Sequence, residues 1–84
     1  NVHPQIALNL ENDEEYKALL NAKSEIYQLA VTLGGTISAE HGVGTEKIPY
    51  IENVIDKASI EQMKRIKMLF DPKGILNPDK IFRI

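Results

Sequence analysis

The predicted fold is decided by one stretch near the start of the chain, Val2-His3-Pro4-Gln5-Ile6-Ala7-Leu8-Asn9-Leu10. The apolar residues at positions 2, 6, 8 and 10 share one face, whereas His3 and Gln5 project from the other. A period of two is typical of a β-strand with one buried face. Pro4 cannot donate a hydrogen bond to a neighbouring strand, so we expect an edge strand or an irregular strand start.

A long helix is predicted next, from Asp13 to Leu33. Asn12 and Glu15 have the spacing of a capping box at its beginning. Gly34-Gly35 should end the helix, because glycine readily adopts the left-handed conformation that follows a helix. The apolar residues of this segment recur on one stripe and are Tyr16, Leu19, Leu20, Ile26, Tyr27, Ala30 and Leu33.

A second short strand is predicted at residues 36–40, followed by a tight loop at residues 41–44 that contains two glycines. Strand, helix and strand form a βαβ unit, whose strands should be parallel with a right-handed crossover. Two parallel strands alone make a poor sheet. We therefore expect a neighbouring strand, supplied by an upstream segment of a longer protein or by a second copy of the chain.

The second half of the chain is predicted to be helical. Residues 47–54 form a short helix or an irregular stretch, and a clear helix runs from Ile60 to Phe70 with Ser59 and Gln62 as its capping pair. Its expected buried stripe consists of Ile60, Met63, Ile66, Leu69 and Phe70. We expect two portions, a βαβ portion at residues 1–44 and a helical segment at residues 45–84.

Composition excludes several functional classes. The chain has 84 residues, a net charge of −2 and no cysteine, which argues against nucleic acid as a partner and rules out disulfides, thiolate metal sites and cysteine nucleophiles. No apolar run is long enough to span a bilayer. The chain does not begin with Met, so we expect a piece of a longer protein; a processed small protein is the alternative. We expect a cytoplasmic location, with any membrane attachment made through partner subunits.

The densest group of polar residues lies at residues 38–44, where Glu40 and His41 leave the end of the predicted strand side by side. His3 opens one predicted strand and Glu40 closes the other, so on an ideal parallel pair they lie at opposite edges. A joint metal site at His3 and Glu40 therefore needs an offset in register, and two ligands are fewer than zinc normally takes. A simple alternative for His41 is a loop residue hydrogen-bonded to nearby backbone.

Three blocks of the sequence resemble the FAD-linked oxidases, the group that includes glycolate oxidase, D-lactate dehydrogenase and D-2-hydroxyglutarate dehydrogenase. Residues 35–44, GTISAEHGVG, are similar to the block G-x-x-S-x-E-H-G-x-G. Residues 68–82, MLFDPKGILNPDKIF, resemble the carboxy-terminal pattern that ends in D-P-x-x-I-L-N-P-x-K. Residues 1–3, NVH, match the end of H-x-G-D-G-N-[LV]-H. The blocks occur in order and cover nearly the whole chain.

The resemblance implies a role for individual residues. His41 is expected to be the catalytic base, and His3 and Glu40 are expected to bind a divalent metal such as zinc. Gln5 falls where some relatives have a residue that contacts substrate. The resemblance also implies that three residues lie near the FAD cofactor: Asn1, Asn77 and Lys80. An ordinary turn is the alternative for residues 77–80.

The resemblance further implies an α+β fold, in which the βαβ portion belongs to a ferredoxin-like cap domain followed by a small helical segment. The expected function is oxidation of a D-2-hydroxy acid, such as glycolate, D-lactate or 2-hydroxyglutarate, to the 2-oxo acid. FAD is expected to bind mainly to a flavin domain upstream, so the chain alone should be inactive and bind metal weakly. Alternatives are a free-standing ligand-binding module or a dimerisation module that pairs through an exposed strand edge.

Overall fold

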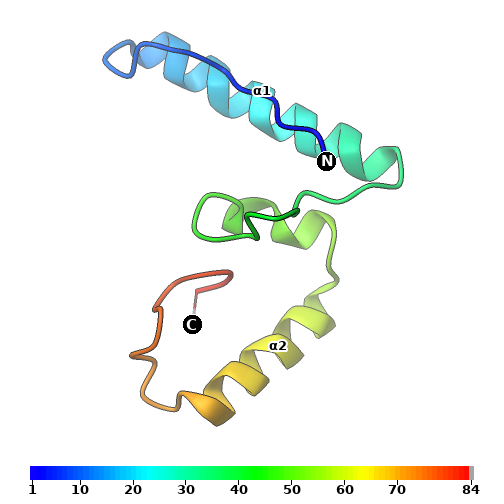
Figure 1. The fold of residues 1–84 in the computed structure, drawn as a ribbon, viewed down its shortest axis with the longest axis vertical. Coiled ribbons are helices and arrows are strands. Elements are labelled where there is room, and N and C mark those ends of the chain that lie inside the picture. Colours follow the sequence, from blue (N-terminus) through cyan, green and yellow to red (C-terminus); the bar gives the residue numbers. More distant parts are fainter. Residues whose placement is uncertain (84) are drawn as a thin grey trace.

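The computed structural model describes residues 1–83, and their regular secondary structure consists of helices alone. Helix α1 spans Asp13–Thr32, the 3-10 helix η1 spans Ile48–Asn53, and helix α2 spans Lys57–Phe70. Figure 1 shows α1 at one end of the molecule and α2 at the other, with η1 between them. The described part of the chain contains no helix that is long and apolar enough to cross a membrane.

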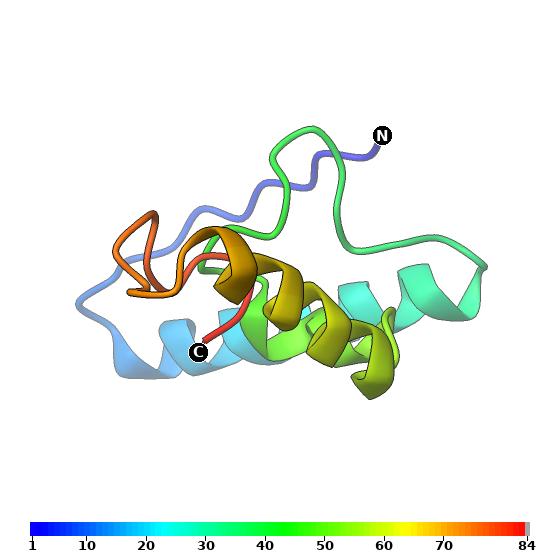
Figure 2. The same ribbon diagram turned by 90° about the horizontal axis from the view of Figure 1, so that it is seen from below.

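The predicted α+β fold with a ferredoxin-like βαβ unit is therefore wrong. The amino-terminal residues run as extended chain alongside α1, and no strand pairs with them within residues 1–83 (Figures 1 and 2). Residues 36–40 form bends and a turn instead of a second strand. Val2 and Leu10, which the alternation places on a buried face, are 89% and 74% exposed. Alternation favours extended backbone, but a sheet also needs partners for the backbone hydrogen bonds.

The predicted strand edge for pairing with a second copy is likewise missing from residues 1–83. A single chain does not test the predicted dimer, and pairing through an exposed strand edge stays a prediction.

Helix α1 begins and ends close to the predicted positions. The Asn12 side chain accepts hydrogen bonds from the backbone N–H groups of Glu14 and Glu15, at 3.1 and 3.2 Å. In a complete capping box the Glu15 carboxylate would accept from the N–H of Asn12. Here it accepts from the N–H of Asn9 instead, three residues earlier in the preceding turn. At the other end, Gly34 takes a φ of +83°, which a residue without a Cβ adopts at little cost.

Two hydrogen bonds complete the end of α1. The Gly34 N–H donates to the carbonyl of Val31 at 3.0 Å, and the Gly35 N–H donates to the carbonyl of Ala30 at 2.8 Å. This pair of bonds defines a Schellman motif, which satisfies carbonyl groups that the helix leaves unpaired. The motif turns the chain away from α1 and toward the loop that carries Glu40 and His41.

Helix α2 begins at Lys57, three residues before the predicted start. Its cap is Asp56, whose carboxylate accepts from the Ser59 N–H at 2.8 Å and from the Ser59 hydroxyl at 2.9 Å. The hydrogen bonds from Ser59 hold the pKa of Asp56 below its usual value. Ser59 is therefore a donor inside the first turn and not the capping residue that its spacing to Gln62 suggests.

A small apolar core lies in the middle of the molecule. The buried apolar side chains of the described part are Ile37, Ile51, Ile60 and Phe82. They come from the segment after α1, from η1, from α2 and from the tail, so each of these four segments contributes one buried apolar side chain. Helix α1 is joined to η1 by an edge-to-face contact between Tyr27 and Tyr50, with ring centroids 4.8 Å apart.

The predicted buried stripe of α2 is mostly exposed. Ile60 is 4% exposed, but Ile66, Leu69 and Phe70 are 60%, 77% and 79% exposed. The radius of gyration is 15.0 Å, whereas a compact domain of this length has a value of about 12 Å. The chain therefore leaves apolar surface uncovered that a self-contained domain of this size would bury.

The tail after α2 is fixed by Asp71, a buried carboxylate that is 4% exposed. It accepts hydrogen bonds from the N–H groups of Ile75 and Leu76 at 3.1 and 3.0 Å and pairs with Lys67 at 2.5 Å. The Lys67 ammonium also donates to the Leu76 carbonyl at 2.6 Å. The hydrogen bond from Lys67, assisted by those from the backbone, holds the pKa of Asp71 below its usual value.

The tail also reaches the loop that follows Glu40 and His41. The Ile81 N–H donates to the carbonyl of Gly44 at 2.8 Å. This bond joins the two predicted portions on either side of residue 44, and the division itself stays a prediction.

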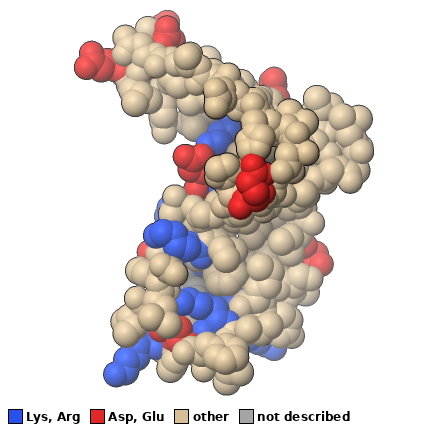
Figure 3. All heavy atoms as spheres, viewed as in Figure 1, with Lys and Arg blue, Asp and Glu red and all other residues tan. Residues whose placement is uncertain are grey.

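Charge is divided unequally along the chain. Residues 1–56 contain three Lys and nine Asp or Glu, whereas residues 57–83 contain seven Lys or Arg and three Asp or Glu. Figure 3 shows the basic side chains gathered over the half of the molecule that carries α2 and the tail. The amino-terminal part is acidic with a net charge of −6, and the α2 part is basic with a net charge of +4.

Candidate functional site

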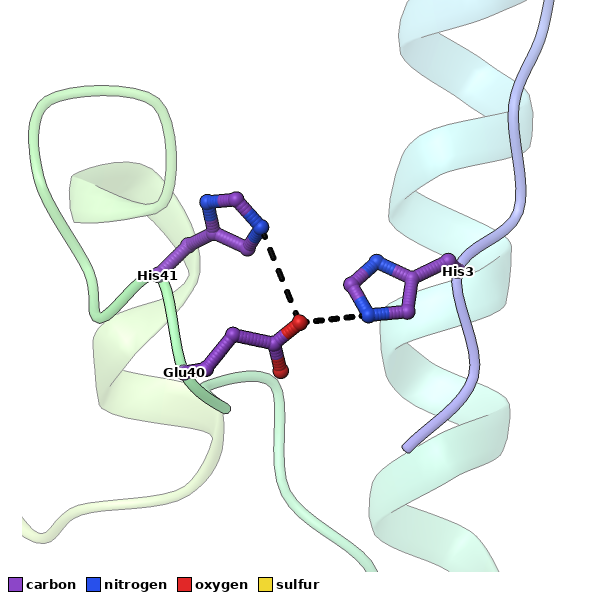
Figure 4. A group of neighbouring side chains, drawn as sticks. All are labelled: His3, Glu40 and His41. Atoms are coloured by element: carbon purple, nitrogen blue, oxygen red, sulfur yellow. Dashed lines mark ion pairs between the residues drawn. The ribbon is translucent and has the colours of Figure 1, made fainter.

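Three polar side chains converge between the amino-terminal segment and the loop that follows α1 (Figure 4). His3 Nε2 lies 2.5 Å from Glu40 Oε1, and His41 Nε2 lies 3.7 Å from the same oxygen. The two imidazole rings meet edge to face with centroids 5.8 Å apart. One carboxylate oxygen is thus flanked by two imidazoles that come from distant parts of the sequence.

Backbone turns position Glu40 and His41. The Gly42 N–H donates to the carbonyl of Ala39 at 3.0 Å, which closes a turn around the pair. Gly42 and Gly44 have φ values of +70° and +55°, in the left-handed region that glycine adopts most easily. The two glycines of the motif therefore let the chain reverse directly after His41.

Asn1 adds a contact on the other carboxylate oxygen, since its side-chain amide donates to Glu40 Oε2 at 2.5 Å. Glu40 is thereby held from both sides by residues of the amino-terminal segment. His3, Glu40 and His41 remain 55%, 46% and 77% exposed, so the cluster is open to solvent. This openness leaves room for a ligand or for another part of a longer protein.

The structure brings His3 and Glu40 together, although an ideal pair of parallel strands would have placed them at opposite edges. The reason is that no sheet separates them in the described residues. The amino-terminal segment runs beside α1, and after the helix the chain folds back toward the start of that segment (Figure 2). The predicted fold gave these residues the wrong relative positions, whereas their predicted roles stay predictions.

A hollow of about 520 Å³ lies beside the cluster. Asn1, His3, Ser38, His41 and Lys47 supply its polar lining, and α1 contributes an apolar wall. Imidazole, amide, hydroxyl and ammonium groups beside an apolar wall are suited to a small polar molecule with an anionic group.

Lys47 is a residue that the sequence motifs did not single out. It lines the same hollow as His3 and His41 and brings a cation to it. Its position three residues after Gly44 was the available signal, because a loop that presents His41 to a ligand also presents the residues just beyond its second glycine.

The other predicted site residues lie elsewhere. Gln5 is exposed on the amino-terminal segment and does not line the hollow beside His41. Asn77 and Lys80 line a separate hollow of about 330 Å³ at the end of α2, together with Lys67 and Phe82. The structure therefore groups Asn1 with His3, Glu40 and His41, and leaves Gln5, Asn77 and Lys80 apart from them.

The donor set of the cluster fits a divalent cation. One donor atom from each of His3, Glu40 and His41 lies within 4.8 Å of the others. Two imidazole nitrogens and a carboxylate oxygen form a ligand set of the kind that catalytic zinc sites use. A cation between His3 and Glu40 would replace the direct contact that these two side chains now make.

Comparison with known proteins supports one family. The model of the family described as "FAD linked oxidases, C-terminal domain" matches residues 1–81. Glycolate oxidase subunit GlcD of Bacillus subtilis is 45% identical over 82 residues, which is 98% of this chain and 17% of the relative. D-lactate dehydrogenase of Archaeoglobus fulgidus is 45% identical over 67 residues, 80% of this chain and 15% of the relative.

A third relative, D-2-hydroxyglutarate dehydrogenase of Stutzerimonas stutzeri, is 41% identical over 73 residues, 87% of this chain and 16% of the relative. No solved structure matches the chain. The chain thus spans about a sixth of the length of these curated relatives. The match along nearly all of its residues shows that the chain belongs to the family of FAD-linked oxidase C-terminal domains.

Proposed function

We propose that the chain is the carboxy-terminal part of an FAD-dependent enzyme that oxidises a D-2-hydroxy acid, with His41 as the catalytic base. The convergence of His3, Glu40 and His41 beside a hollow of small-molecule size is the observation that supports this proposal most strongly. The relatives supply the class of substrate, because their names specify glycolate, D-lactate and D-2-hydroxyglutarate.

The proposed reaction converts a secondary or primary alcohol carbon to a carbonyl. The C–H bond breaks with loss of a hydride, the O–H bond breaks with loss of a proton, and the C=O double bond forms. His41 takes the proton, because its neutral imidazole carries a ring nitrogen with a free lone pair that can accept it. Bound FAD supplies the acceptor for the two electrons and the hydrogen.

Glu40 supports this role of His41 electrostatically. Its carboxylate oxygen lies 3.7 Å from His41 Nε2, so in the metal-free cluster its negative charge stabilises an imidazolium there, whereas a divalent cation on Glu40 would offset that charge and act on the substrate hydroxyl instead. Because the same carboxylate contacts His3 and Asn1, its position beside His41 is fixed by two further contacts.

We assign the metal ligands to His3 and Glu40. A divalent cation there would lower the pKa of the substrate hydroxyl and orient it toward His41. His41 Nε2 cannot both hold a cation and accept a proton, so the assignment of His41 as base leaves the chain with two ligands. Zinc usually takes at least three ligands from protein, and the binding by this chain alone should therefore be weak.

Calorimetric titration with zinc tests this assignment. The 84-residue chain should bind zinc with micromolar or weaker affinity, and replacing His3 by Ala should abolish the heat of binding. Submicromolar affinity that disappears in His41→Ala would instead make His41 a third ligand and would remove it as the base.

We propose that Lys47 binds the carboxylate of the substrate. Every 2-hydroxy acid carries a carboxylate next to the reacting carbon, and Lys47 brings a positive charge to the hollow that His41 also lines. In the longer protein, Lys47→Met should raise KM about tenfold or more with a smaller change in kcat, the pattern of a lost binding contact. An unchanged KM would exclude this role.

The remaining roles concern residues outside the cluster. We propose that Asn77 and Lys80, which line the hollow at the end of α2, contact the flavin-binding part of the protein, and that Gln5 contacts substrate only once that part is in place. Asn1 would reach the cofactor side of the site from its position on Glu40.

Turnover of the longer protein tests the proposed function. The protein that carries this chain should be purified with FAD and assayed with an artificial electron acceptor on glycolate, D-lactate, D-2-hydroxyglutarate and the two L-enantiomers. We expect oxidation of at least one of the first three acids and preference for the D-enantiomer. A flavin-loaded protein that oxidises none of them would overturn the proposal, and a protein that holds no flavin would favour a binding or dimerisation module.

A further inference from the structure

The loop that carries His41 receives a backbone hydrogen bond from the opposite end of the chain. The Ile81 N–H donates to the carbonyl of Gly44 at 2.8 Å. Among the described residues, the other backbone hydrogen bonds of residues 41–44 are local and stay within residues 39–47. Figures 1 and 2 show the tail turning back from the end of α2 toward this part of the chain. The far side of the loop is therefore held by the tail.

The residue that makes this bond has a backbone conformation that its type disfavours. Ile81 has a φ of +71°, in the left-handed region, where a Cβ crowds the backbone and a branched Cβ crowds it further. Asn77 and Asp79 also have positive φ values, of 43° and 56°, but asparagine and aspartate tolerate this region. Ile81 is therefore the strained point of the tail, and its conformation persists only if surrounding contacts stabilise it.

Two contacts stabilise the conformation of Ile81. Its own side chain is 40% exposed, so burial of that side chain contributes only in part. The first contact is the hydrogen bond to Gly44, and the second is the burial of the next side chain, Phe82, which is 8% exposed. The strained backbone thus belongs to the arrangement in which Phe82 is buried and the loop is bonded to the tail.

We propose that Ile81 is a positioning residue, whose backbone N–H holds Gly44 and thereby keeps His41 beside Glu40. The inference rests on the proposed function for the role of His41. Gly42 and Gly44 both lie in the left-handed region and give the loop more backbone freedom than other residues would. A hydrogen bond from outside the loop, three residues after His41, limits that freedom.

Two variants of Ile81 separate the backbone contact from the side chain. Ile81→Pro has no N–H to donate and cannot adopt a positive φ, so it loses the bond to Gly44. Ile81→Gly keeps the donor and adopts the left-handed conformation at little cost, and is the matched control. Both variants remove the same partly exposed side chain, so a difference between them reports on the backbone. Phe82→Leu, which loosens the buried anchor of the tail, is the second variant if Ile81→Pro lowers the flavin content.

Amide hydrogen exchange, read by mass spectrometry on the longer protein, measures how often the loop opens. The reporters are the N–H groups of Gly42 and Lys47, which are hydrogen-bonded within the loop segment. We expect exchange in the peptide covering residues 40–50 to be about tenfold or more faster in Ile81→Pro than in Ile81→Gly, with the peptides of α1 unchanged. Equal exchange in the two variants would overturn the proposal whether or not the protein oxidises hydroxy acids.

Stopped-flow flavin reduction at saturating substrate tests the effect on catalysis. In the flavin-loaded protein the rate constant depends on the position of His41, whereas loss of folded protein lowers only the amplitude. We expect the rate constant to fall about tenfold in Ile81→Pro, in proportion to the population of the closed loop, and to equal that of the wild type in Ile81→Gly. A wild-type rate constant in Ile81→Pro would overturn the positioning role and leave the proposed function standing. A wild-type protein whose flavin no acid reduces would overturn the proposed function, and faster loop exchange in Ile81→Pro would then still support the contact between tail and loop.

Discussion

Replacing Gly42 by Ala should lower catalysis through the backbone of the loop that holds His41. Gly42 has a φ of +70°, and among the described residues no heavy atom lies within 4 Å of the position where a Cβ would stand. The new methyl group therefore meets no neighbour, and its whole cost is the left-handed backbone, roughly 1–2 kcal/mol for a residue with a Cβ.

The size of the effect follows from this strain. If the loop relieves the strain by leaving its left-handed turn, the population with His41 beside Glu40 falls. At about 1.36 kcal/mol for each factor of ten, 1–2 kcal/mol corresponds to a decrease in kcat/KM of about 5-fold to 30-fold. The measurement is steady-state turnover of the longer, flavin-loaded protein, with the melting temperature recorded alongside.

Gly34→Ala is the matched control. Gly34 has a φ of +83° and equally open surroundings, but it lies at the end of α1 and does not line the hollow beside His41. It should lose about as much stability as Gly42→Ala and keep its kcat/KM. Equal kinetic losses in the two variants, or none in either, would show that the turn after His41 does not govern catalysis.

Three further predictions concern the fold. Ile60→Ala removes a side chain that is 4% exposed and should lower the free energy of unfolding by about 2–5 kcal/mol in urea titrations; a loss below about 0.5 kcal/mol would place Ile60 outside the core. Asn12→Ala removes the cap of α1 and should cost about 1 kcal/mol, detected as a lower thermal midpoint of helical circular dichroism; an unchanged midpoint would argue against the cap. The lowered pKa of Asp71 means that its contribution to stability is present above the pKa of the unfolded carboxyl and is lost as pH falls through the lower folded pKa. Asp71→Asn should therefore flatten the acid side of the stability profile, and an acid limb as steep as that of the wild type would contradict the pairing with Lys67.

Local sequence signals predict a helix end correctly where a single residue determines the backbone conformation. Gly34 ends α1 as predicted, since left-handed backbone after a helix depends on that residue and its immediate neighbours. The start of α2 differs from the prediction because both Asp56 and Ser59 can cap a helix, and in the structure Asp56 caps it by accepting hydrogen bonds from Ser59.

Non-local structure could not be predicted from the same signals. The alternation at residues 2–10 correctly indicates extended chain, but a sheet requires partner strands that residues 1–83 do not provide. The periodicity of Ile66, Leu69 and Phe70 correctly identifies an apolar face on a helix, but periodicity does not tell whether this chain or another segment covers it.

The candidate site likewise combines residues that local sequence signals identify with positions that depend on non-local packing. The motif around Glu40 and His41 identified both residues through resemblance, together with His3, and the structure brings these three together. Lys47 was missed because its presence in the hollow depends on the turn at Gly42 and Gly44 and on how η1 packs below α1. Residue type and spacing alone do not encode that packing.

The most direct test of the central claim is the rate at which substrate reduces the flavin in the longer protein, measured by stopped-flow absorbance without oxygen, for the wild type and His41→Ala. Unchanged flavin absorbance before mixing shows that the variant still holds its cofactor. If His41 removes the hydroxyl proton, flavin reduction should slow by about a hundredfold or more. Flavin reduction at the wild-type rate in His41→Ala would contradict the assignment of the base.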